Sequence, residues 1–195
     1  MAAHLVLAQI QKRHEEKTMK IGSITSENRG ETDQILVDLA AKMQANGKRL
    51  VGIVKDVEYE SRFENGCDMR VRVLPDGPVI PITQSLGDGS GACRLDPAGI
   101  TLAVQTVINS NLKEADLFIL NKFGPEEGQG RGFRDAISLA VSAGVPVLVG
   151  LGSGAEIRSK FDMFCGGVAE AIAPDLNKIE RWVDSDNQLA DRNRL

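Results

Sequence analysis

Short apolar runs that alternate with helical segments are the feature that most constrains the fold of this chain. Segment 31–46 carries apolar residues every three or four positions, as a helix packed on a core does, and Gly47 follows as a stop signal. The run LVGIV at 50–54 is apolar and β-branched, which predicts a buried strand. The alternation continues, with strands expected at 21–25, 50–54, 116–121 and 145–151 and helices at 31–46, 97–111 and 133–143.

This alternation predicts an α/β fold with a doubly wound, mostly parallel sheet that is covered by helices on both faces. Segment 68–74 departs from it, because apolar residues alternate there with arginines, as in a strand with one wet face; residues 79–83 are its expected hairpin partner. After residue 151 we expect a Gly-Ser-Gly loop and a helix at 177–183. A chain of 195 residues can bury one core. We therefore expect an extension at 1–19, a single domain at 20–184 and a loose tail at 185–195.

Composition excludes several classes of protein. A net charge of -4 argues against a protein that holds nucleic acid or anionic lipid by bulk electrostatics. No run of about 18 apolar residues is present to span a bilayer. The three cysteines are widely spaced without a CxxC pair, and both histidines lie near the N-terminus. This pattern indicates a reducing compartment, which predicts a cytoplasmic protein, and it gives no metal site.

The segment TSENRGET at 25–32 stands where a phosphate-binding P-loop, GxxxxGK[ST], is expected between the first strand and its helix. Gly30 and Thr32 match this pattern. Thr25 replaces the first glycine, however, and Glu31 replaces the lysine. A carboxylate there repels the β- and γ-phosphates, so ordinary ATP hydrolysis is not expected.

Two interpretations of this loop stay open. In the functional one, Arg29 supplies the missing cation from a neighbouring position, and Asn28 is a further ligand. In the structural one, Gly30 is only a turn, and Glu31 and Asp33 are first-turn carboxylates that the helix dipole favours.

The segment NKFGPEEGQGRG at 121–132 follows a buried strand and is dense in charge and glycine. Loops at the carboxyl ends of parallel strands are where such sheets bind ligands. Asn121 and Lys122 could donate to an anion, while Glu126 and Glu127 could hold a metal or activate water. The structural alternative is a solvated turn whose charges pair with one another.

The segment GSGACRLDPAG at 89–99 offers backbone donors, the Arg94 cation and the Cys93 thiol just before a helix. Its structural alternative is capping of that helix by Asp96 and Pro97, with Cys93 as a small buried residue. The Gly-Ser-Gly loop at 152–154 is a weaker signal of the same kind.

Two of these motifs, Asn-Lys-Phe-Gly at 121–124 and Cys-Arg-Leu-Asp-Pro at 93–97, together with the strand VPVLVG, resemble the bacterial DUF2478 family over roughly residues 20–183. That family is similar to degenerate P-loop nucleoside triphosphatases of the THEP1 type, so the resemblance implies a P-loop-NTPase-like, three-layer fold. Relatives of that type carry Asp-Glu-Ile-Gly at the Walker B strand exit. Here Asn121 and Lys122 replace both acids. The resemblance further implies an association with molybdenum uptake and molybdenum enzymes.

The leading hypothesis is a P-loop-like protein that binds a nucleotide or an oxyanion such as molybdate, as a carrier, sensor or accessory factor. One alternative is an active nucleoside triphosphatase that uses Lys122 with Glu126 or Glu127; another is a homo-oligomeric scaffold. The identity of any cofactor is left open, and the expected partner is a small anion. The candidate ligand-binding residues are Thr25, Asn28, Arg29, Gly30, Thr32, Cys93, Arg94, Asn121, Lys122, Glu127, Gln129 and Arg131.

Overall fold

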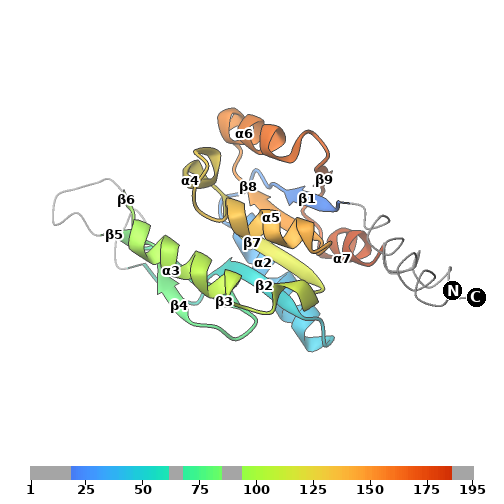
Figure 1. Cartoon of the computed structure of the whole chain (residues 1–195), viewed down its shortest axis with the longest axis horizontal. Helices are drawn as coiled ribbons and strands as arrows, with labels where there is room; N and C mark the ends of the chain where they lie inside the picture. Colours follow the sequence, from blue (N-terminus) through green and yellow to red (C-terminus); the bar gives the residue numbers. More distant parts are fainter. Residues whose placement is uncertain (1–18, 62–67, 85–93, 186–195) are drawn as a thin grey trace, which may run out of the picture.

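The computed structural model describes residues 19–61, 68–84 and 94–185, in which a seven-stranded, mostly parallel sheet forms the centre of the fold (Figure 1). The strand order is β4-β3-β2-β7-β8-β1-β9. Strands β2, β7, β8, β1 and β9 are parallel, and the β3-β4 hairpin adds an antiparallel edge. The strands are β1 (Ile21–Ile24), β2 (Leu50–Lys55), β3 (Arg70–Leu74), β4 (Val79–Pro81), β5 (Thr83–Gln84), β6 (Arg94–Leu95), β7 (Leu117–Phe123), β8 (Val147–Leu151) and β9 (Glu170–Ile172).

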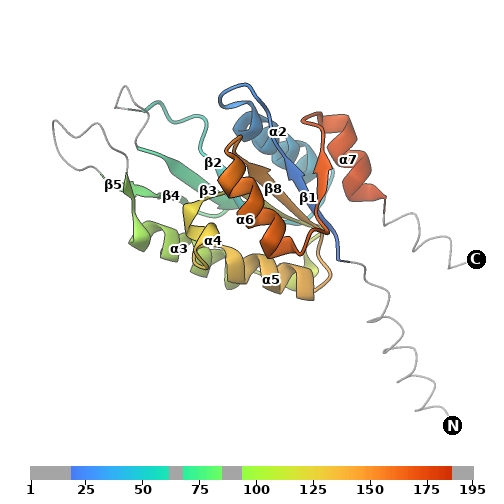
Figure 2. The ribbon, with the colours of Figure 1, turned by 90° about the horizontal axis from the view of Figure 1, so that it is seen from above.

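Helices cover both faces of this sheet, as the sequence predicts. Figure 2 shows α2 and α7 on one side of the strands and α3 and α5 on the other. Two buried clusters match these layers: one joins the sheet to α2 and α7, and the other joins it to α3, α5 and α6. The helices are α2 (Glu31–Ala45), α3 (Pro97–Ile108), α4 (Pro125–Gly128), α5 (Arg134–Ser142), α6 (Ala155–Cys165) and α7 (Leu176–Asp184), with a 3-10 turn at Leu112–Glu114.

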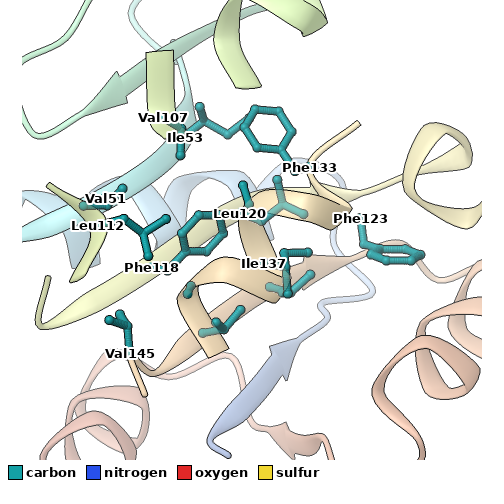
Figure 3. Packing of buried hydrophobic residues seen from close by; sticks show 14 of the residues in the cluster. Val51, Ile53, Val107, Leu112, Phe118, Leu120, Phe123, Phe133, Ile137 and Val145 are labelled. Atoms are coloured by element: carbon teal, nitrogen blue, oxygen red, sulfur yellow. The ribbon is translucent and has the colours of Figure 1, made fainter. Parts of the chain in front are cut away.

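The aromatic core sits between β7 and the helices that cover it. Phe118, Phe123 and Phe133 are buried there with aliphatic side chains of β2, α3 and α5 (Figure 3). The Phe123 ring meets that of Phe161 in α6 edge-on, with centroids 5.2 Å apart. This contact fixes α6 against the end of β7.

The structure corrects four details of the sequence prediction. Strand β7 runs on to Phe123 and the helix α4 follows, so residues 122–131 are not one loop. Helix α3 ends at Ile108 rather than near residue 111. Thr83, expected at the end of the hairpin partner 79–83, instead pairs with β6 together with Gln84. Helix α6 and strand β9 were not predicted at all.

No helix in the described part of the chain is long and apolar enough to cross a membrane. The predicted tail begins at residue 185, the last described position. Residues 186–195 of this tail, and residues 1–18 of the extension predicted at 1–19, lie outside the described residues.

Candidate functional site

The carboxyl ends of the parallel strands share one edge of the sheet, and the segments that follow them form the candidate site. Strand β8 lies between β1 and β7 in the strand order, so its exit at Gly152 stands between theirs. Ligands of open α/β sheets bind at this edge, beyond the carboxyl ends of the strands.

The loop between β1 and α2 is closed by its own side chains. Gly30 enters α2 with a φ of 81°, which a glycine adopts without strain. The Ser26 N–H donates to Thr32 Oγ1 at 3.1 Å, and the Asn28 N–H donates to Ser26 Oγ at 3.0 Å. The Ser26 hydroxyl and the Asn28 amide both donate to the Glu31 carboxylate, the amide at 3.0 Å.

Hydrogen bonds from Ser26 and then Asn28 hold the pKa of Glu31 below its ordinary value of 4.5. At neutral pH the loop that corresponds to a P-loop therefore holds an internal anion, at the position where that motif carries a lysine. The Ser26 hydroxyl and the Asn28 amide could each face a phosphate, but both already donate to Glu31. Thr25 is half-buried, and Arg29 is exposed without an ion pair to any described residue.

Asn121 belongs to a polar network that sequence reasoning missed. Its amide nitrogen donates to Asp33 Oδ1 at 3.0 Å, and its amide oxygen accepts from the Lys55 N–H at 2.9 Å. Asp33 also pairs with the Lys55 ammonium at 3.1 Å. The network ties the start of α2 to the exits of β2 and β7. A buried amide thus stands at the Walker B position, where magnesium would need an acid, and the nearby Asp33 carboxylate is engaged by Asn121 and Lys55.

Lys122 is aimed by an irregularity in β7. From Leu120 to Phe123 the strand advances three residues, while its partner β8 advances two, from Val149 to Leu151. One extra residue of this kind re-aims the side chains beside it. The Lys122 side chain is exposed, and its Cε lies 3.7 Å from where a Cβ on Gly152 would stand.

Gly152 is also reached by Arg158 of α6, a residue that the sequence prediction does not include because it does not include this helix. Its Nε donates to the Gly152 carbonyl at 3.3 Å. Its guanidinium lies 3.9 Å from Glu27, whose side chain is 87% exposed.

The acidic groups that follow β7 are engaged in their own segment. Glu127 is 5% exposed, and its two oxygens accept from the Gly124 N–H at 2.9 Å and the Phe133 N–H at 3.0 Å. Glu126 pairs with Arg131 at 2.8 Å, and Arg131 also donates to Gln129 at 2.7 Å.

Hydrogen bonds from Arg131 lower the pKa of Glu126, and the same pair raises the pKa of Arg131. Within the described residues, no hydrogen bond or ion pair links Glu127, Gln129 or Arg131 to segment 25–32, and no three acids, histidines or cysteines group as metal ligands.

The remaining candidates lie at the segment before α3. Asp96 caps this helix, as predicted, by accepting from the Ala98 N–H at 3.1 Å, and Pro97 is its first residue. Cys93 and the Arg94 side chain lie outside the described residues.

Comparison with known proteins agrees with this sheet. A family model described as a protein of unknown function (DUF2478) matches residues 21–182. The molybdenum import ATP-binding protein ModC 2 of Bradyrhizobium diazoefficiens is 31% identical over 165 residues, which are 84% of this chain but 18% of that protein. The chain therefore spans less than one fifth of that relative.

The crystal structure of THEP1 from the hyperthermophile Aquifex aeolicus has a TM-score of 0.52 and 14% sequence identity, and the match covers 88% of this chain and 98% of THEP1. At this identity, the likeness shows the fold alone. The chain belongs to the DUF2478 family and has an α/β fold similar to that of THEP1.

Proposed function

We propose that the protein binds a small anion, an oxyanion or a nucleotide, at the carboxyl edge of its sheet and does not hydrolyse nucleotides. The observation that carries this proposal is the position of Lys122. The β7 irregularity directs this cation to the exit of β8, beside Gly152, and no acidic group of the described residues pairs with it.

The groups needed for nucleotide hydrolysis are either replaced or engaged in other contacts. Glu31 stands at the Walker lysine position and Asn121 at the Walker B position, and Asp33, the acid beside Asn121, is paired with Lys55. The acids of the hydrolase alternative are also occupied, because Glu127 accepts two backbone N–H groups and Glu126 is paired with Arg131. These contacts support binding over turnover.

We further propose an accessory, carrier or sensor role in molybdenum metabolism. Its support is the name of the relative ModC 2, a molybdenum import ATP-binding protein, although the match covers 18% of that protein. Molybdate is a tetrahedral dianion, which is the kind of ligand that a lysine and backbone N–H groups can hold.

Titration calorimetry with molybdate, tungstate, phosphate, ATP and GTP tests the binding proposal. The wild type should bind at least one of them, and Lys122→Ala should weaken that binding about tenfold or more, the loss of one charge-assisted hydrogen bond. Lys42→Ala is the control, because this exposed lysine in the last turn of α2 pairs with Glu180 away from the carboxyl edge.

The alternatives give different results in the same experiment. Release of phosphate from ATP or GTP that Lys122→Ala abolishes would favour the hydrolase. No binding of any of these anions at millimolar concentration would refute the proposal and favour an oligomeric scaffold.

A further inference from the structure

Arg158 and Lys122 reach Gly152 from different elements. Arg158 donates to the Gly152 carbonyl at 3.3 Å, and Lys122 Cε lies 3.7 Å from the place of a Gly152 Cβ. The strand irregularity aims Lys122, while the contact of Phe123 with Phe161 fixes the helix that carries Arg158.

The acids nearby do not neutralise these two cations. Glu27 is the acid that faces Arg158, at 3.9 Å and 87% exposed, and so distant and exposed a pair contributes little. Glu156, in the first turn of α6, pairs with Lys160 at 2.6 Å. Glu31 accepts from Ser26 and Asn28 within its own loop. Positive charge is therefore in excess at the exit of β8.

We infer that Lys122 and Arg158 together hold one tetrahedral oxyanion dianion beside Gly152, an inference that rests on the binding function proposed above. Two cations that reach one residue repel each other, since the exposed Glu27 at 3.9 Å from Arg158 offsets little of their charge, and a dianion between them removes that repulsion. Arg158 can present two N–H groups to such an ion, and Lys122 adds a point charge.

The same geometry favours a free oxyanion over a nucleoside triphosphate. In a P-loop, the donors of the loop after the first strand surround the phosphates of the nucleotide. Here the Ser26 hydroxyl and the Asn28 amide are bound to the Glu31 carboxylate, which would repel a polyphosphate tail. A single small anion at Gly152 does not need this loop.

Calorimetry with molybdate, phosphate and ATP on the wild type, Arg158→Gln and Arg72→Gln tests the inference. Arg72 is the control: both arginine side chains are 42% exposed and lie 3.9 Å from a glutamate that is 87% exposed, and Arg72 also pairs with Asp56 at 3.5 Å. Arg72 lies in β3, three positions from β8 in the sheet, which is about 14 Å away. Arg158→Gln should weaken binding of the oxyanion about tenfold or more, and Arg72→Gln less than about twofold.

Arg158→Lys is a second variant, which keeps the positive charge but loses the planar pair of N–H donors. Its affinity for the oxyanion should lie between those of the wild type and Arg158→Gln. Unchanged oxyanion affinity in both Arg158 variants, with binding intact in the wild type, would overturn the inference and leave the proposed function standing. Tighter binding of ATP than of either oxyanion would overturn the assignment of a free oxyanion as the ligand. Absence of binding in the wild type would instead refute the proposed function itself.

Discussion

The Glu127→Gln variant tests whether the Glu127 carboxylate has a structural or a catalytic role. The Glu127 side chain is 5% exposed, and each of its oxygens accepts one backbone N–H, from Gly124 and Phe133. Glutamine retains one acceptor oxygen but turns an NH₂ group toward the other N–H. That buried donor loses its partner, which costs about 1 to 3 kcal/mol, and the remaining hydrogen bond loses its charge. The free energy of unfolding should therefore fall by about 2 to 4 kcal/mol.

Urea denaturation followed by circular dichroism at pH 7 measures this loss, and in a thermal scan it corresponds to about 4 to 16 °C in Tm for a chain of this size. The control is Glu126→Gln, which breaks the exposed pair with Arg131 and should cost less than about 1 kcal/mol. Equal stability of Glu127→Gln and the wild type would refute the structural role and return Glu127 to the hydrolase alternative.

The remaining predictions concern turnover, one carboxylate and one thiol. With magnesium, the protein should release no phosphate from ATP or GTP in a malachite green assay, because Glu31 and Asn121 replace the required cation and acid; sustained release would contradict this. Because the folded-state pKa of Glu31 is depressed, its carboxylate stabilises the protein above the ordinary value of 4.5, and this contribution is lost as pH falls through the lower folded value. The difference in the free energy of unfolding between wild type and Glu31→Gln should thus be constant from pH 7 to about pH 5.5 and shrink below about pH 4.5. An increase of this difference on acidification would mean that the pKa of Glu31 is raised on folding, which would contradict the prediction. Burial, and then the charge of Asp162, raise the pKa of Cys165 to about 11, so peptide mapping after iodoacetamide treatment at pH 8 should find Cys165 unmodified until the protein is denatured.

The elements that carry strong local signals were predictable from sequence. The helix spacing of 31–46 and the Gly47 stop gave α2 within one residue, and the apolar runs gave β2, β7 and β8. Local periodicity reports which face of an element is buried, and this was sufficient for the sheet and its helical layers.

Two other elements, α6 and β9, were not predicted from the sequence. Helix α6 follows the Gly-Ser-Gly loop and carries Ile157, Phe161 and Cys165 four residues apart, a helical signal that the prediction does not use. Strand β9 has three residues, two of them exposed, and so offers no pattern to read.

The candidate site was less predictable, because its contacts join distant parts of the chain. Asn121 bonds to Asp33 across 88 positions, and no local pattern encodes that pair. The irregularity that aims Lys122 depends on the register between two strands. Arg158 was missed together with its helix. The sequence does not show either that Glu31 accepts hydrogen bonds from its own loop. A glutamate at the Walker lysine position already indicates, however, that nucleotide hydrolysis is lost.

A crystal structure of the protein with tungstate, located by the anomalous scattering of tungsten, tests the central claim most directly. The account predicts a peak at the carboxyl edge of the sheet, beside Gly152 and within hydrogen-bonding distance of Lys122. The peak should be absent in Lys122→Ala crystals grown under the same conditions. A wild-type map without a tungsten peak at this edge, or with the peak elsewhere on the molecule, would contradict the account.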